Sequence, residues 1–254
     1  MKCFYITNGN QLKNIIENIT KMNPVHFDIH SIRQERQRAN NSLVLECMKN
    51  RDLTKNVNRK ELDRALNEME ITEDEFLDKC QADIIFAKGL AGRISINASR
   101  QGTKDEDFQI TTCNITSSKC GTTIENLSTT AYRATKSGEI ITNSQVKTSK
   151  IQKNDCLKSF DGKISGEKNG WLSAKFVIGR GGHQDNVFEE EHTLCDWIIK
   201  YGKENEIYMI LIDTDLLSQL NELKQKYTAH PNIIIGNHVE IQQYFIDTYN
   251  ASEL

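Results

Sequence analysis

The sequence predicts an α/β protein in which helices flank a mixed central sheet and the N-terminal region is mainly helical. Three observations lead to this fold class. Apolar residues recur at helical spacing in the first part of the chain, polar and apolar residues alternate from about residue 91, and strand and helix patterns follow one another after residue 170. We therefore expect a helical region over residues 1–90 and an α/β core over residues 91–254.

The N-terminal region contains three segments with helical periodicity. They cover residues 11–21, 32–48 and 61–69. Asn58 precedes Glu61 by three positions, and Thr72 precedes Glu75 by the same interval. This is the spacing of a capping box, in which a side-chain oxygen and a carboxylate each bind a backbone N–H of the first turn. We expect helices to begin just after Asn58 and Thr72.

The middle of the chain changes its period. Residues 93–97 and 107–113 alternate polar and apolar residues, as half-buried strands do. Residues 114–168 are rich in Thr, Ser, Asn and Lys and have little periodicity, so we expect a long loop insertion with short strands near Ile140 and Val146. Loops of this length in a compact domain are usually binding elements or partly disordered segments.

The last third of the chain alternates strands and helices, which is typical of a sheet whose strands end up mostly parallel. Strands are expected over residues 171–178, 207–212 and 233–235, and helices over residues 186–201, 216–227 and 239–249. Asp213 and Asp215 close the second of these strands. Open α/β sheets bind ligands at such positions, but Asp213 followed by Thr214 also favours a helix start, and we prefer the helix cap.

Composition indicates a globular protein with a polar surface. Apolar residues make up 37% of the 254 residues and the mean hydropathy is −0.56. No apolar run approaches the roughly 20 residues that a membrane span needs, and the first residues lack the apolar core of a signal peptide. The seven cysteines show no C-x-x-C pair or zinc-type spacing. These features predict a cytoplasmic protein with reduced thiols.

Charge is distributed unevenly along the chain. The net charge is −3, with about +5 in residues 100–180 and about −9 in residues 181–254. A phosphate-rich partner would meet the basic middle of the chain, where Arg133 and Lys136 are candidate contacts. The alternative is that these cations only keep exposed loops soluble.

One group of residues has the chemistry of phosphodiester hydrolysis, which needs carboxylates that hold a divalent cation and a lysine near the attacked phosphate. Ser173 and Lys175 project from the same face of a strand because they are two residues apart. Glu189 follows Lys175 by 14 positions, just inside the next helix. The remaining acid comes from the strand expected at 107–113, where Asp105 is preferred over its neighbours Glu106 and Asp107.

Each of these residues also has a structural explanation. Lys175 suits a strand end, with its stem on the sheet and its ammonium in water. Glu189 suits the third position of a capping box that begins at Asn186. Glu190 falls on the apolar stripe of the same helix and replaces Glu189 if that carboxylate points away.

These residues resemble the PD-(D/E)-x-K nucleases, in particular the type II restriction endonucleases that carry Ser-x-Lys in place of acid-x-Lys and recruit a glutamate from the next helix. Ser173, Lys175 and Glu189 match that variant. The resemblance covers about residues 100–215. Asp105 lacks the preceding proline and lies far from Ser173, so the loop expected at 114–168 would be an insertion.

The resemblance implies a Mg²⁺-dependent, sequence-specific endonuclease that cuts double-stranded DNA as a two-fold symmetric homodimer. Asp105 and Glu189 would hold the metal ion. A glycine-interrupted turn beside the site would contact DNA, since Arg and Gln can make bidentate contacts to bases. The turn residues concerned are Arg180, His183, Gln184 and Asp185. The alternatives are a structure-specific nuclease of the same fold and a DNA-binding module without catalysis.

Overall fold

The computed structural model describes residues 22–127, 132–148, 151–179 and 185–252. The chain divides into two compact units, of which one comprises Phe27–Gly102 and the other comprises Met1–His26 together with Thr103–Leu254. We call them the helical unit and the sheet unit. The helix expected at residues 11–21 lies outside the described residues.

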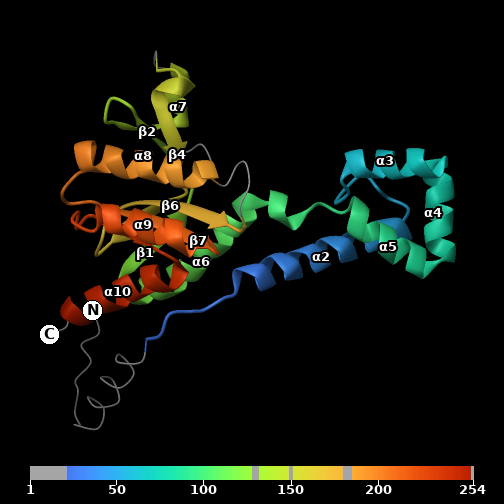
Figure 1. Cartoon of the computed structure of the whole chain (residues 1–254), viewed down its shortest axis with the longest axis horizontal. Helices are drawn as coiled ribbons and strands as arrows, with labels where there is room; N and C mark the ends of the chain where they lie inside the picture. Colours follow the sequence, from blue (N-terminus) through green and yellow to red (C-terminus); the bar gives the residue numbers. More distant parts are fainter. Residues whose placement is uncertain (1–21, 128–131, 149–150, 180–184, 253–254) are drawn as a thin grey trace, which may run out of the picture. The chain divides into compact units, whose positions relative to one another are not determined.

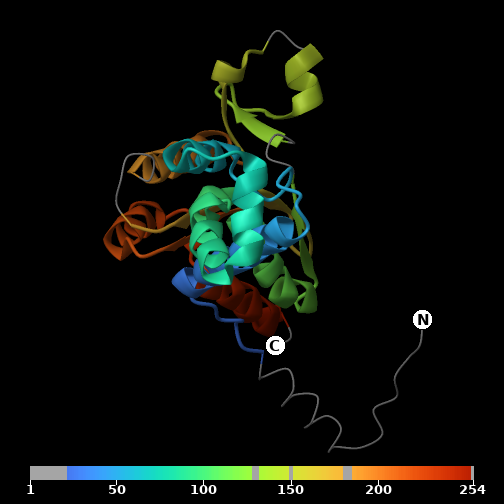
Figure 2. The same cartoon turned by 90° about the vertical axis from the view of Figure 1, so that its right-hand side faces the viewer.

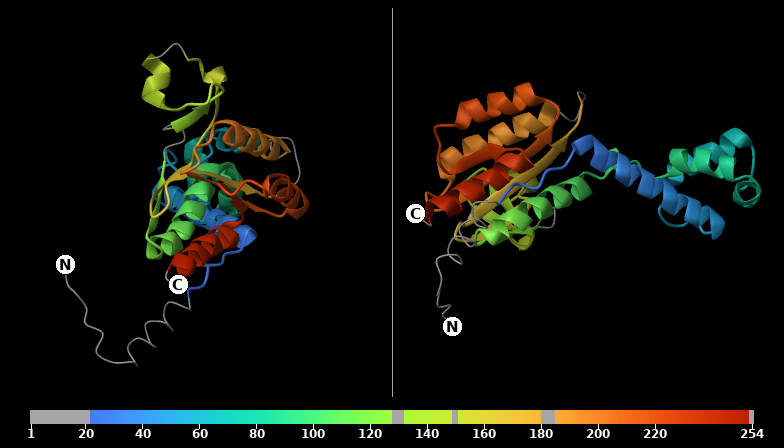
Figure 3. Two further views of the ribbon diagram at one scale, coloured as in Figure 1. Left: turned by 90° about the vertical axis from the view of Figure 1, so that its left-hand side faces the viewer. Right: turned by 90° about the horizontal axis from the view of Figure 1, so that it is seen from below.

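The helical unit is built from four α-helices and a short 3-10 helix. These are α2 (Ile29–Lys49), α3 (Arg59–Met69), α4 (Glu73–Ala82), α5 (Ile84–Ile94) and η1 (Ala98–Arg100). Within this unit α5 packs against α2, α3 and α4 around an apolar core (Figure 3). The capping box of Thr72 and Glu75 forms as expected, and Asn58 caps α3. The helices predicted over residues 32–48 and 61–69 are thereby confirmed.

The strand predicted at residues 93–97 is wrong. Arg93 and Ile94 are the last residues of α5, which Asp83 caps by accepting hydrogen bonds from the backbone N–H groups of Ile85 and Phe86. The remaining trace of extended structure is one isolated bridge between Ser95 and Val57. The segment 93–97 is too short for its alternation of polar and apolar residues to distinguish the end of a helix from a strand.

The sheet unit contains a sheet of five strands, which is mixed as the sequence predicted. Its spatial order is β1 (Thr122–Asn126), β5 (Gly162–Gly166), β6 (Gly170–Val177), β7 (Ile207–Thr214) and β8 (Ile233–Gly236). The pairs β1–β5 and β5–β6 are antiparallel, whereas β6–β7 and β7–β8 are parallel. Strand β7 is buried along almost its whole length, which explains its continuous apolar sequence.

Two helices cover each face of this sheet (Figure 1). One face carries α8 (Asp185–Tyr201) and α9 (Leu217–Tyr227), and the other carries α6 (Gly102–Lys119) and α10 (His238–Ser252). Because residues alternate along β6, Leu172 and Ala174 pack toward α6 and α10. Ser173 and Lys175 therefore face the α8 side.

Residues 107–113 form the middle of α6, so the strand predicted there is also wrong. The buried side of this helix includes polar residues, among them Asp105, Gln109 and Thr116, alongside Ile110 and Cys113. An apolar stripe at helical spacing is consequently missing from the sequence, and a chance alternation imitates a strand.

The stretch expected to be a loop insertion, residues 114–168, is largely structured. Besides the end of α6 and strands β1 and β5, it contains a small antiparallel sheet with two short helices. These elements are β2 (Tyr132–Thr135), β3 (Ile140–Thr142), β4 (Cys156–Ser159), α7 (Asn143–Thr148) and η2 (Lys153–Asp155). The strand expected near Ile140 is confirmed, whereas Val146 lies in α7. Figure 2 shows this small sheet projecting from the main sheet.

Within the described part of the chain, no helix has the length and apolarity that crossing a bilayer requires. The six described cysteines, Cys47, Cys80, Cys113, Cys120, Cys156 and Cys195, all carry free thiols. Burial raises the pKa of the Cys80 thiol to about 11, which keeps this sulfur protonated at neutral pH.

Candidate active site

Four elements of the sheet unit bring one lysine and three carboxyl groups together. Lys175 on β6 places its Nζ 2.7 Å from Asp161 Oδ2 and 3.9 Å from Glu106 Oε1. Asp161 immediately precedes β5, and Glu106 lies in the first turns of α6. Glu191 on α8 also interacts electrostatically with Lys175. We call Glu106, Asp161, Ser173, Lys175 and Glu191 the Lys175 cluster.

The β5–β6 hairpin fixes the position of Asp161. Its backbone N–H donates to Leu172 O and its carbonyl oxygen accepts from Leu127 N–H, each at 2.9 Å. The side chain then lies beside β6, where Oδ2 accepts from the backbone N–H of Ala174 as well as from the Lys175 ammonium. The second oxygen, Oδ1, accepts no hydrogen bond from the described residues. Asp161 thus has one oxygen held by the protein and one available to a ligand.

Glu191 is the most deeply buried acid of the cluster. Its Oε1 accepts a hydrogen bond from Ser173 Oγ at 2.8 Å, and its side chain is only 2% exposed. The other oxygen, Oε2, is buried and has no partner among the described residues. Burial raises the pKa of Glu191 to about 7, although Lys175 and the Ser173 hydroxyl counteract the shift. A buried carboxylate oxygen without a donor requires an explanation, and a bound cation is one that would satisfy it.

The remaining charges of the cluster are also perturbed. Burial raises the pKa of Glu106 to about 7, partly offset by the nearby Lys175. For Lys175, burial alone would lower the pKa, but Asp161, Glu191 and Glu106 together raise it well above its usual value. The lysine is therefore permanently charged, whereas Glu106 and Glu191 change charge near neutral pH.

A buried polar network supports Lys175 from the other face of the sheet. Gln109 on α6 donates from Nε2 to the carbonyl oxygen of Lys175 at 2.9 Å and to Asp213 Oδ2 at 2.8 Å. Asp213 Oδ1 lies 2.7 Å from His238 Nδ1 and accepts from the His238 backbone N–H. The expectation that Asp213 caps a helix is therefore wrong, since it ties β7 to α6 and α10. This network fixes the backbone of β6 at the position of the lysine.

The structure brings Ser173 and Lys175 together as the sequence predicted but changes their acidic partners. Asp105 is fully buried within α6 instead of opening a strand, and its neighbour Glu106 approaches the lysine. Asp107 is exposed.

The predicted helix glutamate is also displaced. Glu189 is exposed, and its backbone carbonyl accepts from Thr193 Oγ1 within the helix. Asn186 already lies inside α8, so it does not begin a capping box for Glu189. Glu190, the fallback, forms an ion pair with Lys158 at 3.2 Å. The acid that faces Ser173 is Glu191.

Of the predicted DNA contacts, Arg180, His183 and Gln184 lie outside the described residues, and Asp185 begins α8. Arg133 lies on β2 and donates from Nη1 to Leu157 O at 3.3 Å. Lys136 is exposed directly after β2. Both cations therefore belong to the small sheet.

Two members of the cluster were missed from the sequence, and each had a usable signal. Asp161 precedes an alternating segment that pairs with the Ser173 strand, and it lies only 12 positions before Ser173. With Asp161 as the acid, no long insertion separates it from the lysine. Glu191 lies on the same side of its helix as the buried Leu194, Cys195 and Ile198. Glu189 does not share that spacing.

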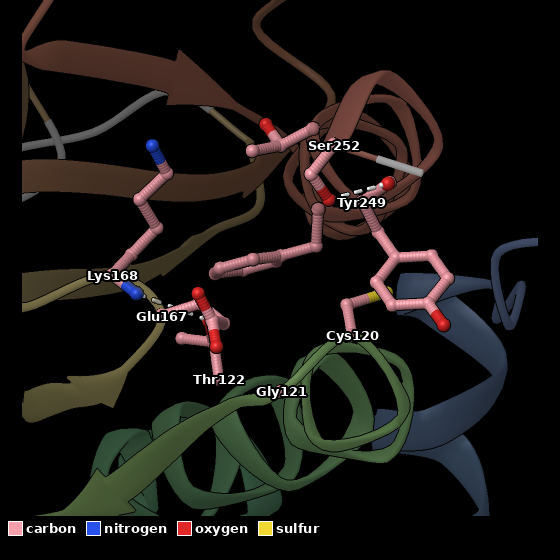
Figure 4. A pocket seen from close by; sticks show the side chains of 9 residues that line it. Cys120, Gly121, Thr122, Glu167, Lys168, Tyr249 and Ser252 are labelled. Atoms are coloured by element: carbon pink, nitrogen blue, oxygen red, sulfur yellow. Dashed lines mark hydrogen bonds between the residues drawn. The ribbon is translucent and has the colours of Figure 1, made fainter. Parts of the chain in front are cut away.

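A hollow of about 370 Å³ lies at the other end of β6, between the turn after α6, the β5–β6 turn and α10 (Figure 4). Two of its polar groups bond within the chain. The Lys168 backbone N–H donates to Thr122 Oγ1, and Ser252 Oγ donates to the Tyr249 carbonyl oxygen. The Lys175 cluster is the stronger candidate for catalysis because its charged groups converge and one buried carboxylate oxygen, Glu191 Oε2, has no partner among the described residues.

No protein-family model, curated protein or solved structure matches the chain. The chemistry of the Lys175 cluster is therefore the basis for proposing a function.

The Lys175 cluster contains carboxylate oxygens, which are ligands that divalent cations such as Mg²⁺ accept. Among the residues that the structure describes, no three His, Cys, Asp or Glu side chains form a ready-made metal-binding group. Mg²⁺ does not require one, since it is commonly held by one or two carboxylates and keeps several waters. Asp161 Oδ1 and the orphaned Glu191 Oε2 supply two such oxygens next to Lys175. The donor chemistry of these residues is thus compatible with Mg²⁺.

Proposed function

We propose that this protein is a Mg²⁺-dependent endonuclease of the PD-(D/E)-x-K type that cuts double-stranded DNA at specific sites, as type II restriction enzymes do. The observation that carries the proposal is the arrangement around Lys175. An acid, Asp161, stands at the start of one strand, Ser-x-Lys lies on the next, and a glutamate reaches them from the following helix. This is the pattern of the Ser-x-Lys variant, with Asp161 and Glu191 replacing the acids expected from the sequence.

The roles of the side chains follow from their positions. Asp161 and Glu191 would hold the cation, and a bound Mg²⁺ would polarise the scissile phosphate and make water a better nucleophile at neutral pH. Lys175 places a permanent positive charge where negative charge develops on the phosphate. Ser173 holds Glu191 in place through its hydroxyl. Glu106, with a pKa of about 7, is suited to exchanging a proton with water near the lysine.

Specific cutting of both strands requires two equivalent sites, so we propose that the active form is a two-fold symmetric homodimer. The cations of the small sheet, including Arg133 and Lys136, would contact the DNA backbone. Such contacts position a protein on the duplex without reading its sequence.

The test is to incubate the protein with phage DNA and Mg²⁺ and to separate the products by electrophoresis. Discrete bands support site-specific cleavage. A smear indicates a nuclease without sequence specificity, and intact DNA contradicts nuclease activity.

Two variants connect the activity to the cluster. Asp161→Asn keeps the shape of the side chain but removes its charge, so cleavage should fall by roughly a hundredfold or more. Glu189→Gln is the matched control because Glu189 is an exposed acid on the same helix as Glu191, and this variant should cut normally. Equal activity in Asp161→Asn and wild type would mean that cleavage takes place elsewhere on the chain.

A further inference from the structure

An aromatic hollow of about 470 Å³ lies where the small sheet meets the end of α8 and the starts of β6 and β7. Figure 1 shows the small sheet lying over α8 at this place. Both tryptophans of the chain and three of its seven tyrosines line the hollow. They are Tyr132, Trp171, Trp197, Tyr201 and Tyr208. Such a concentration of aromatic side chains around an open volume suits a planar or cationic ligand.

The chain itself holds several of these rings in fixed orientations. Trp197 donates from Nε1 to Thr135 O at 2.6 Å, and the polar groups of Trp171 and Tyr208 both bind Glu206 Oε2. Trp197 and Tyr208 are buried, at 6% and 1% exposure, and support the hollow from below. The partly buried rings of Tyr132, Trp171 and Tyr201 supply the aromatic surface that a ligand could contact. By contrast, the hydroxyl groups of Tyr132 and Tyr201 form no hydrogen bond with described residues.

The β2–β3 turn closes the hollow on the side of the small sheet. Gly138 has a φ of +103°, and a Cβ at this position would lie 2.5 Å from Cδ1 of Tyr201. Only glycine permits this approach. The turn therefore holds the next residue, Glu139, at the rim of the hollow.

Glu139 supplies a charged acceptor at that rim. Its side chain is exposed, and its carboxylate has no ion pair or hydrogen bond among the described residues. Lys136 and Lys147 are exposed on the same small sheet and its helix α7. The rim thus presents an acceptor for N–H groups, and the small sheet beside it carries exposed cations that attract phosphate.

We propose that the aromatic hollow binds one unpaired DNA base that carries an amino group at purine C6 or pyrimidine C4, namely adenine or cytosine. The aromatic rings would stack on the base, and Glu139 would accept from its amino group, as carboxylates do with cytosine. Thymine offers a carbonyl oxygen in place of this amino group and is disfavoured. That the base comes from DNA rests on the proposed function.

The position of the hollow suits a base near the cleavage site. Trp171 and Lys175 lie on the same face of β6, four residues apart, which corresponds to about 13 Å along a strand. DNA held at the Lys175 cluster would therefore pass the small sheet within a few base pairs of the hollow.

Tryptophan fluorescence tests the proposal directly, because both tryptophans line the hollow. Wild-type protein in EDTA, which prevents metal-dependent cleavage, is titrated with short duplexes of equal length. One duplex is fully paired, and the others carry a single unpaired dA, dC or dT. We expect the dA and dC duplexes to quench the fluorescence and to bind about tenfold more tightly than the paired duplex.

Three variants distinguish the proposed contacts. Tyr132→Leu should remove the advantage of the unpaired base. Glu139→Gln should abolish the preference for dA over dT, about fivefold in wild type, because an amide can also donate to thymine. Glu139 is exposed, so this change leaves the core intact. Lys168→Ala in the hollow of Figure 4 is the control and should bind like wild type.

The outcomes separate this inference from the nuclease proposal. Equal affinity for paired and unpaired duplexes, or a wild-type preference for dT over dA, would overturn base binding whether or not the protein cuts DNA. A preference for dA over dT that survives Glu139→Gln would overturn the proposed contact with the amino group. Quenching by choline but not by the unpaired duplexes would identify a site for quaternary ammonium ions and would also overturn it. Conversely, tight binding of unpaired dA by a protein that cuts no DNA would support the hollow and contradict only the nuclease.

Discussion

Replacing Glu191 by glutamine should stabilise the fold while impairing DNA cleavage. Glutamine has the shape of the protonated acid, and its side-chain oxygen can still accept the hydrogen bond from Ser173. It has no charge to be held in a buried position. It also loses the anionic oxygen that would bind the cation.

The size of the effect follows from the pKa of the buried acid. Burial raises the pKa of Glu191 from 4.5 to about 7, so the folded protein keeps a proton that the unfolded chain releases between these values. Wild-type stability therefore falls as the pH rises through this window, by up to about 3 kcal/mol, at 1.36 kcal/mol per pKa unit. The variant avoids this loss. Its advantage over wild type should be about 2 to 3 kcal/mol larger at pH 8 than at pH 5.

Urea denaturation at pH 5, 6, 7 and 8 in EDTA measures this difference. In both proteins one buried side-chain atom of residue 191 lacks a partner, which costs a constant free energy. Comparing how the free energy of unfolding changes with pH, instead of its value at one pH, removes this constant. Glu189→Gln is the matched control, since it makes the same substitution at an exposed position of the same helix. With Mg²⁺ present, Glu191→Gln should cut DNA roughly a hundredfold more slowly.

The reasoning would be refuted by a Glu191→Gln variant whose stability advantage is the same at pH 5 and pH 8. Such a result would mean that the carboxylate is hydrated in solution or already ionised at pH 5. Normal cleavage by the variant would separately show that Glu191 does not bind the metal.

Three further predictions concern the same site and the small sheet. Lys175→Ala should slow cleavage about 10²–10³-fold while Ca²⁺-supported DNA binding persists in a gel-shift assay, and loss of binding would contradict a purely catalytic role. It should also lower the free energy of unfolding at pH 8 by about 3 kcal/mol, because Asp161 loses its buried partner. The initial cleavage rate should rise from pH 6 to pH 8 as Glu106 and Glu191 lose their protons, and Glu106→Gln should make this rise less steep. Replacing exposed Lys136 and Lys147 by alanine should reduce the salt dependence of log K by about 0.9 per lost phosphate contact, and an unchanged slope would exclude them from the DNA interface.

Local patterns in the sequence determined much of the sheet unit. The continuous apolar run of β7 and the helical spacing of α8 identify these elements because each pattern lies within a single segment. The alternation along β6 also places Ser173 and Lys175 on one face, and the structure confirms it. In α6 the same approach fails, because polar residues such as Gln109 occupy its buried side to serve the site.

Only the tertiary structure decided which acids surround the lysine. Asp161 lies beside Lys175 because of the antiparallel register of β5 and β6, a pairing between separate segments that no local period specifies. Glu191 replaces Glu189 because the rotation of α8 is fixed by packing its apolar side on the sheet, and two residues turn a helix by about 200°. The sequence by itself determined the strand that carries Lys175. Long-range packing determined the acids beside Lys175. The residues of an active site come from separate elements, and the loops that join these elements set the residues' spacing along the chain without regard to the site.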